Sequence, residues 1–250
     1  MASPSLSTIE RKGPLLLRPM LPRDSEAYLR IVDHAFQDTM TALFFPNGKT
    51  PADEDWSRQA LHRAMTRDAH FTTHLVCIDT SSPPLPSDIA RLSASDAADA
   101  KAEGRVAGIS VWKIHPRQRT QAELDEEAQR SEEGGLPPTA RQEVLDAFFG
   151  AIKRCKSKWL PDGQAHVLLH LLGTDPEYHR RGIGGMHLRW GLGEADRLGV
   201  VGYLEGTEDG VPLYQRYGFE GREMMPFDHE ALGTREVRCL IMIRPAKASS

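Results

Sequence analysis

The 250-residue sequence predicts a mixed α/β fold, and two observations support this prediction. Residues 166–205 follow the order strand, glycine-rich turn, helix and strand, a spacing that fits a parallel βαβ crossover. Two segments near the C-terminus, 219–225 and 237–244, are typical of further strands and favour an antiparallel finish to the sheet. The predicted sheet is therefore mixed.

The elements before this crossover follow from the spacing of apolar residues. Runs rich in strand-forming residues predict three strands, at 15–19, 71–78 and 106–114. Helical periodicity predicts one helix that begins at Asp24, a second over 53–67 and a third from Thr139. The third helix carries a continuous apolar stripe, formed by Val144, Phe148, Ile152, Cys155 and Trp159. We interpret this stripe as core.

The domain organisation is one compact unit with polar decorations. We predict a single domain over 14–245, a flexible arm at 1–13 and a tail at 246–250. Residues 79–104 are biased toward Ser, Ala, Asp and Pro, so they are expected to form a surface insertion that is partly disordered. A second insertion, 116–138, holds six acidic residues against one arginine between positions 123 and 133. It is either a solvated helical face or a lid that attracts cationic substrates.

The composition is that of a globular protein and excludes several functional classes. Hydrophobic residues make up 40% and charged residues 26%, and the net charge of −4 argues against a nucleic-acid partner. Cys77, Cys155 and Cys239 are too scattered for a disulfide framework or a zinc cluster, so we expect three buried thiols and no metal. No apolar run reaches the length of about 18 residues typical of a membrane span. We therefore expect a soluble, cytoplasmic protein without a membrane partner.

The segment that indicates a specific chemistry is HLLGTDPEYHRRGIGGMHLRWGLGEADRLG. An apolar strand ends in a proline-containing turn, and residues 180–185 then open a helix. Glycines let the backbone approach a ligand, and the first amides of a helix are unpaired and electropositive, which favours an anion such as a pyrophosphate. Arg180 and Arg181 add positive charge. The spacing is neither that of a Walker A loop nor a full GxGxxG.

This segment resembles the acetyl-CoA-binding motif of the GNAT superfamily of N-acetyltransferases, [Q/R]-x-x-G-x-[G/A]. Gly182 and Gly184 occupy the glycine positions, and His179 stands where the family has Gln or Arg. The turn 175–178 resembles the family's D/H-P-x-Y turn, and residues 213–219 match its L/F-Y-x-x-x-G-F signature. The region 194–207 is similar to fungal-type members. The firm resemblance covers 165–221.

The resemblance implies a GNAT-like fold, with a mostly antiparallel twisted sheet around the parallel βαβ unit and helices on both faces. It also implies direct transfer of acetyl from acetyl-CoA, as cosubstrate, to a primary amine. The cofactor-binding residues that it implies are Leu172, Gly173, Thr174, His179, Arg180, Arg181, Gly182, Ile183, Gly184, Gly185, Thr207 and Tyr214. Thr207 replaces an Asn that is frequent in the family, and backbone amides at 172–174, on a strand opened by a bulge, would polarise the carbonyl.

The same resemblance suggests the catalytic groups. Tyr214 is the candidate general acid, because a phenol near sulfur can protonate a thiolate; its alternative role is packing. Tyr217 is expected to be structural. His170 is the candidate general base, as at the corresponding position of the arylalkylamine acetyltransferase branch, and its alternative is a core histidine. His166 is a weaker candidate, and Glu205 remains open.

The acceptor is left open by the sequence. A small-molecule primary amine is the leading interpretation, and acetylation of a protein or peptide amine is the alternative within the same class. A catalytically silent acyl-CoA-binding module is the alternative from another class. The sequence fits a monomer or a homodimer.

Overall fold

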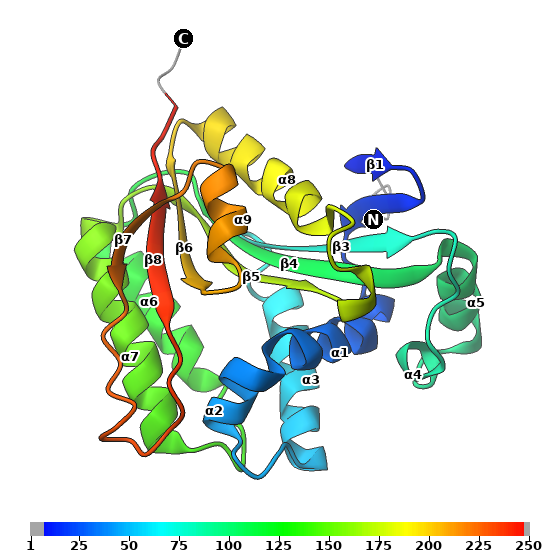
Figure 1. Cartoon of the computed structure of the whole chain (residues 1–250), viewed down its shortest axis with the longest axis horizontal. Coiled ribbons are helices and arrows are strands. Elements are labelled where there is room, and N and C mark those ends of the chain that lie inside the picture. Colours follow the sequence, from blue (N-terminus) through cyan, green and yellow to red (C-terminus); the bar gives the residue numbers. More distant parts are fainter. Residues whose placement is uncertain (1–7, 248–250) are drawn as a thin grey trace.

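The fold is centred on one mixed sheet, seen in a computed structural model that describes residues 8–247 (Figure 1). Its strand order is β1-β2-β3-β4-β5-β6-β8-β7. The strands are β1 (Glu10–Lys12), β2 (Leu15–Pro19), β3 (Thr72–Asp79), β4 (Arg105–His115), β5 (His166–Thr174), β6 (Val201–Thr207), β7 (Glu220–Met224) and β8 (Cys239–Arg244). Neighbours are antiparallel except β5 and β6. The predicted mixed, mostly antiparallel sheet with one parallel unit is confirmed.

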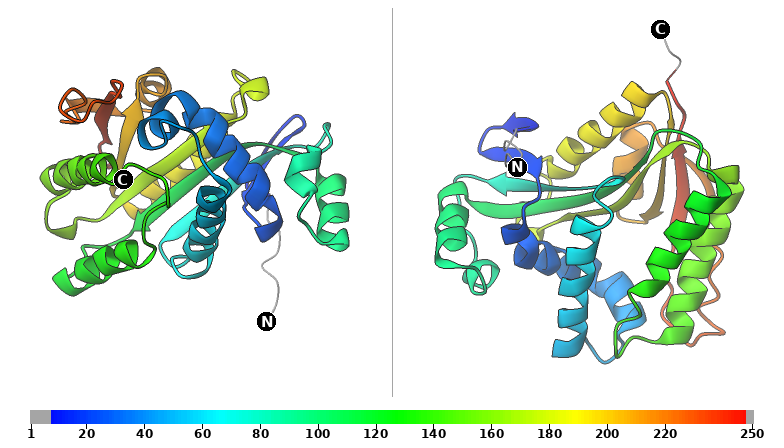
Figure 2. Two further views of the ribbon diagram at one scale, coloured as in Figure 1. Left: turned by 90° about the horizontal axis from the view of Figure 1, so that it is seen from below. Right: turned by 180° about the vertical axis from the view of Figure 1, so that it is seen from behind.

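Helices cover both faces of this sheet (Figures 1 and 2). The lower face in Figure 1 carries α1 (Ser25–Phe36), α3 (Pro51–Thr66), α6 (Gln121–Glu133) and α7 (Gln142–Trp159). The upper face carries α8 (Ile183–Leu198) and α9 (Val211–Arg216). Strand residues alternate between the two faces, so Leu75 and Trp112 pack with α8 whereas Val76 and Val111 pack with α1. Two apolar layers result, and the sheet lies between them.

The segment before β2 is more ordered than the sequence predicts. Within the expected arm, Glu10–Lys12 form β1, which pairs with β2 so that Glu10 lies opposite Leu17. The amide of Ile9 also donates to the carbonyl of Leu17. Residues 1–7 lie outside the described part of the chain. A loose arm is therefore the wrong description for residues 9–12, because backbone pairing holds this polar edge strand.

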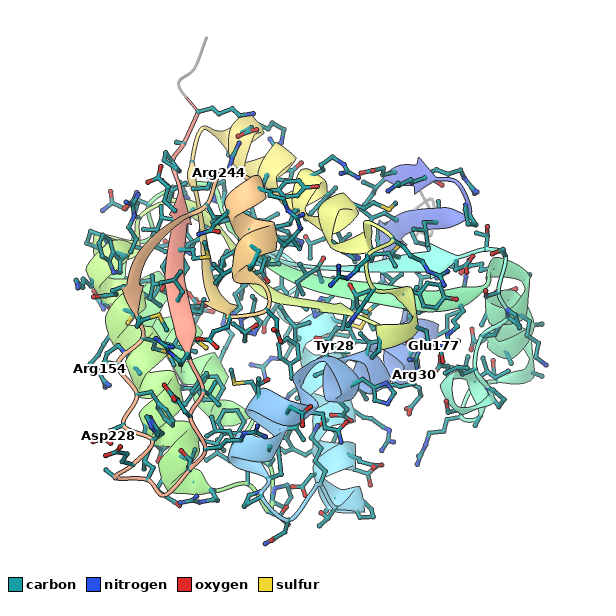
Figure 3. The ribbon with its side chains drawn as sticks, viewed as in Figure 1. Tyr28, Arg30, Arg154, Glu177, Asp228 and Arg244 are labelled. Carbon is teal, nitrogen blue, oxygen red and sulfur yellow. The ribbon has the colours of Figure 1, made fainter. Side chains whose placement is uncertain are left out.

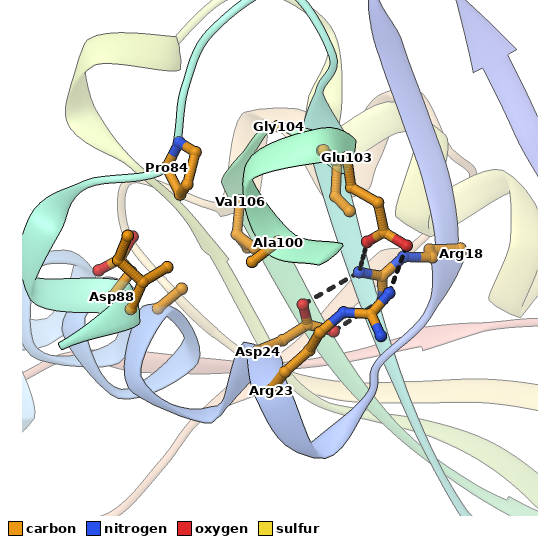
Figure 4. A pocket seen from close by; sticks show the side chains of 12 residues that line it. Arg18, Arg23, Asp24, Pro84, Asp88, Ala100, Glu103, Gly104 and Val106 are labelled. Atoms are coloured by element: carbon orange, nitrogen blue, oxygen red, sulfur yellow. Dashed lines mark hydrogen bonds and ion pairs between the residues drawn. The ribbon is translucent and has the colours of Figure 1, made fainter. Parts of the chain in front are cut away.

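The insertion at 79–104 is helical rather than partly disordered. It begins with the last residue of β3 and contains α4 (Pro86–Ile89) and α5 (Ala94–Glu103). Ser93 caps α5 by accepting a hydrogen bond from the amide of Asp96. At the other end, Glu103 binds Arg18 at 2.6 Å and also pairs with Arg23 (Figure 4). Ion pairs and a helix cap order this segment, although α5 buries no side chain.

The insertion at 116–138 contains α6, as its helical alternative predicts. Its carboxylates are matched by arginines from the same insertion. Glu123 binds Arg117 at 2.6 Å, and Glu127 pairs with Arg119. These pairs neutralise part of the negative charge that the sequence shows here.

The remaining compositional predictions concern cysteines, metals and membrane spans. Cys77, Cys155 and Cys239 are free and buried, as predicted. Among residues 8–247, no group of three or more His, Cys, Asp or Glu side chains is placed to hold a metal ion. No helix in the same range is long and apolar enough to cross a bilayer.

Candidate functional site

The sheet opens between β5 and β6, and this opening is the centre of the candidate site. The parallel register joins His166–Leu168 to Val201–Tyr203 and stops there. Beyond it β5 continues beside β4, whereas β6 continues beside β8. In the described chain, residues 169–174 therefore have no strand partner on the β6 side. Unpaired backbone groups at such an edge can hydrogen-bond an extended ligand.

A β-bulge at His170 shapes the wall of this opening. The register with β4 passes from Trp112–Leu169 directly to Val111–Leu171, so His170 is the extra residue. Leu169 packs in the upper layer and Leu171 in the lower one, against α1. The bulge thus lies just before the amides at 172–174. The family resemblance predicts a bulge in this strand, but it does not identify His170 as the extra residue, because that depends on the register with β4.

The loop at 179–185 follows β5 and starts α8. Gly182 is the N-cap of α8 with a φ of 90°, and Arg180 has a φ of 62°. A Cβ at Gly185 would lie 2.4 Å from the hydroxyl oxygen of Tyr217, and one at Gly184 would lie 2.9 Å from Leu213 Cδ2. The two glycines therefore let α9 pack against the first turn of α8. This close approach joins the two motifs that the sequence shows about 30 residues apart.

Three cations surround this helix start. Arg180 and Arg181 are exposed, and the Arg181 guanidinium lies 4.6 Å from the centre of the Tyr178 ring. The third cation is Lys12 of β1, whose ammonium donates to the carbonyl oxygen of Arg181 at 3.3 Å. Sequence reasoning missed Lys12, because nothing in a polar segment 170 residues away indicates its partner. Cationic side chains and free helix amides together favour a bound diphosphate.

The turn before the loop is held by a buried carboxylate, Asp175. It accepts hydrogen bonds from Arg30 at 2.6 Å, from Arg105 at 2.9 Å and from the amide of Glu177 at 3.1 Å. Although burial opposes ionisation, these donors hold the pKa of Asp175 below its ordinary value. Figure 3 shows Arg30 beside the turn that carries Glu177. The turn is therefore tied to α1 and β4.

Two aromatic side chains of this region also have structural partners. Tyr178 is buried and donates a hydrogen bond to Asp79 at 3.1 Å. His179 places its Nε2 3.2 Å from the carbonyl oxygen of Thr174, so its ring closes the turn. Thr207 ends β6, and its carbonyl accepts the amide of Gly210 at 2.9 Å.

Tyr214 lies on the upper face at the opening. A Cβ at Gly206 would lie 3.2 Å from its ring, and one at Gly210 would lie 2.6 Å from it, so both glycines make room for this side chain. Burial raises the pKa of Tyr214 to about 12, which keeps the phenol protonated at neutral pH. Tyr217 instead accepts a hydrogen bond from Arg189 at 3.1 Å, consistent with a structural role.

Two titratable groups, His170 and Glu205, flank the opening on the lower face. His170 is exposed to solvent, and desolvation by surrounding groups, together with Lys113 and Lys156, lowers its pKa to about 3. Glu205 is half-buried, and its Oε1 atom is buried without a hydrogen-bond partner in the described chain. Burial raises the pKa of Glu205, opposed by the Tyr203 hydroxyl and the Lys156 ammonium. A raised pKa makes a carboxylate a stronger base than an ordinary one, so Glu205 is a candidate proton acceptor alongside His170.

His166 lies away from this point. It is fully buried where β5 and β6 are still paired, and its Nδ1 is 2.7 Å from the carbonyl oxygen of Gln164. Its ring stands 4.8 Å from that of His115. Desolvation lowers the pKa of His166 to about 3. The structure thus places Tyr214, His170 and Glu205 at the opening, and His166 behind it.

Comparison with known proteins identifies the fold. No family model and no curated protein matches the sequence. A Corynebacterium glutamicum structure described as histone acetyltransferase HPA2 and related acetyltransferase matches with a TM-score of 0.55 and 16% identity, over 94% of this chain and 97% of that one. A GNAT superfamily phosphinothricin acetyltransferase of Sinorhizobium meliloti, solved with acetyl-CoA, matches with a TM-score of 0.51 and 15% identity, over 93% and 89%. The chain therefore has the fold of GNAT acetyltransferases.

Proposed function

We propose that this chain, which has the GNAT fold, is an acetyl-CoA-dependent N-acetyltransferase that acts on a primary amine of a small molecule. The observation that carries the proposal is the opening between β5 and β6, which leads to the glycine loop at the start of α8. An unpaired strand edge suits the extended, amide-containing arm of a coenzyme A thioester. The helix start, with Lys12, Arg180 and Arg181, suits its diphosphate.

The acid and the base approach the opening from opposite faces of the sheet. Glu205 and Gly206 are neighbours on β6, so their side-chain positions face opposite ways. Tyr214 packs against Gly206 on the upper face, whereas Glu205 points toward α7 on the lower face. A thioester held between them has a proton donor on one side and a proton acceptor on the other.

In the proposed reaction the amine nitrogen forms a bond to the acetyl carbon, and the carbon–sulfur bond breaks. Glu205 takes the proton that the amine loses, and Tyr214 gives a proton to the departing sulfur. Neutral His170 stands beside Glu205 and accepts a hydrogen bond from the incoming amine. The amides at 172–174 polarise the thioester carbonyl, as oxyanion donors do.

The test is a panel of small amines and short peptides incubated with acetyl-CoA and the full chain. Released thiol and acetylated product are both measured, and a reaction without amine is the control. We expect thiol release that depends on a small amine and equals the product formed. Acetylation of peptides alone would overturn the small-molecule assignment. Binding of acetyl-CoA without transfer to any amine would overturn the enzymatic function and leave a silent acyl-CoA-binding module.

A further inference from the structure

We propose that the acceptor carries an anionic group in addition to its amine, and that Lys113 and Lys156 bind this group. The ligand class is an amine with a nearby carboxylate or similar oxyanion, as in an amino acid. The inference rests on the function proposed above and names the substrate class that the fold leaves open. The supporting observations are the positions and charges of side chains on the lower face, together with the lack of ion-pair or hydrogen-bond partners for several of them.

The strand registers place the proposed anion site beside the opening. Lys113 of β4 lies opposite Leu168, next to the bulge at His170. Leu168 in turn lies opposite Tyr203, and Glu205 follows two residues later on the same face. Lys113, His170 and Glu205 therefore occupy nearby positions on three adjacent strands.

Lys156 reaches the same region from α7. Ile152 and Trp159, which lie one turn before and after it, pack against the lower-face core, so this side of α7 faces the sheet. The Lys156 ammonium interacts electrostatically with Lys113, Glu205 and His170. Desolvation, with Lys113 and Arg119 nearby, lowers the pKa of Lys156, and the carboxylates of Glu127 and Glu205 oppose this shift. Two ammonium groups thus share one half-buried region.

Neither ammonium has a matching carboxylate at short range. Among the side chains that the structure describes, no carboxylate lies within ion-pair distance of Lys113 or Lys156, whereas nearby Arg119 pairs with Glu127. The nearby acids are Glu127, which is already paired with Arg119, and the half-buried Glu205. Enclosing two like charges without an anion is unfavourable. A ligand oxyanion would complete the charge balance and leave Glu205 free for the amine.

Unpartnered polar atoms on this face support a site that a ligand or water completes. In the described chain, buried His166 Nε2 and His115 Nε2 have no hydrogen-bond partner, and Tyr203 Oη and Glu205 Oε1 have at most each other. All four residues face the same layer as Lys113, from strands β4, β5 and β6. Buried polar atoms in proteins almost always have partners. This concentration marks the lower face beside the opening as a polar binding surface.

The surrounding charges favour an anionic acceptor over a cationic one. The acidic residues of α6 were one reason to expect a cationic substrate, but Glu123 and Glu127 are already paired with arginines. The groups that face the opening from β4 and α7 are lysines. An acceptor with a second positive charge would meet repulsion there.

The test compares matched acceptors that differ only in charge: an amino acid, its carboxamide and its decarboxylated amine. The steady-state kcat/KM of each is measured with saturating acetyl-CoA for the wild type, Lys113→Gln and Lys156→Met. We expect the wild type to prefer the free carboxylate by roughly tenfold or more, as a charge-assisted hydrogen bond predicts. Each substitution should remove most of that preference, measured as the ratio of kcat/KM for the amino acid to kcat/KM for its carboxamide in the same variant. Lys153→Met, on the exposed side of α7, is the matched control and should keep the preference.

The outcomes separate this inference from the proposed function. Acetylation of the uncharged or cationic amines at equal or greater efficiency overturns the anion site and leaves the acetyltransferase function standing. An equal loss for all acceptors in both lysine variants, with acetyl-CoA binding intact, also overturns it. Thiol release from none of the amines, although acetyl-CoA binds, overturns the proposed function and this inference with it.

Discussion

At the scale of single residues, Tyr214 has the most specific prediction. Tyr214→Phe removes the phenolic proton but keeps the ring that packs over Gly206 and Gly210. We expect kcat to fall by roughly 10²–10⁴-fold, the usual contribution of general acid–base catalysis, with acetyl-CoA affinity nearly unchanged. Steady-state kinetics and calorimetric titration measure the two quantities. Tyr217→Phe, which loses the bond to Arg189, is the control and should keep kcat.

The opposite result for Tyr214→Phe has a clear meaning. If acetyl-CoA affinity collapses while kcat is maintained, the side chain packs the site and does not supply a proton.

Glu205 determines the expected pH dependence. Its raised pKa means that the carboxylate, the form that accepts a proton, is lost on acidification at a higher pH than for an ordinary glutamate. The kcat/KM of the wild type should therefore decrease on acidification, and Glu205→Gln should remove this limb together with most of the activity. His170, with a pKa near 3, stays neutral above pH 5, so His170→Gln should retain the limb. The pH dependence of kcat/KM is measured for the wild type, Glu205→Gln and His170→Gln. Persistence of the acid limb in Glu205→Gln would show that another group is the base.

Only some residues of the candidate site could be predicted from the sequence. Gly182, Gly184 and Tyr214 belong to short motifs whose residues are close together in the sequence. The sequence alone therefore predicts their positions. The preference for Glu205 over His170 could not be predicted, because it depends on burial and on lysines from other elements. The role of Lys12 could not be predicted either, because only strand pairing brings it close to Arg181.

At the scale of elements, α4 should influence the acetyl-CoA loop through Arg30. The Arg30 guanidinium binds Asp88 of α4 at 2.8 Å and Asp175 of the turn at 2.6 Å, and both carboxylates are buried. Asp88→Asn weakens this link, so we expect the free energy of unfolding to fall by about 1–3 kcal/mol and the KM for acetyl-CoA to rise more than kcat falls. Asp99→Asn, at an exposed position of α5 with only a 3.5 Å pair to Arg23, is the control for removing one acid from the insertion. A decrease in stability with no change in that KM would restrict α4 to a structural role.

The edge strand β1 should contribute to cofactor affinity. Lys12→Met removes the cation beside the start of α8 but no backbone hydrogen bond of β1. We expect a several-fold weaker Kd for acetyl-CoA, corresponding to about 1 kcal/mol, and a smaller dependence of that Kd on salt. Arg11→Met, on the neighbouring exposed position, is the matched control. Equal affinity and salt dependence in the wild type and Lys12→Met would exclude Lys12 from the site.

Predictability also differs among elements for physical reasons. β5, α8 and β6 bury apolar side chains, so their periodicity predicts them within a few residues of their observed bounds. β1 and α5 bury almost none, and they are held by backbone pairing, a Ser93 cap and Glu103 ion pairs. Such long-range polar contacts leave no hydrophobic pattern. Segments without an apolar face were therefore the ones mistaken for arm and disordered insertion.

At the scale of the whole molecule, the sheet separates two tasks. The upper face, with α8 and α9, holds the loop suited to the cofactor and Tyr214. The lower face, with α1 and α7, presents Glu205 and the two lysines to the acceptor. The two faces of the sheet are connected at the opening between β5 and β6. In the proposed reaction, the two substrates enter from opposite faces of the sheet and meet at this opening.

Binding at such a central opening should stabilise the whole fold. A ligand that binds only the native state at 100 times its Kd adds about 2.7 kcal/mol, and each kcal/mol raises Tm by roughly 2–4 °C in a protein of this size. Acetyl-CoA should therefore raise Tm by about 5–10 °C in differential scanning fluorimetry. Pantetheine, which lacks the diphosphate, is the ligand control and should give a much smaller shift, because it cannot use the helix start and Lys12. An unchanged Tm at millimolar acetyl-CoA would contradict the cofactor assignment, and equal shifts from both ligands would contradict the role given to the loop at 179–185.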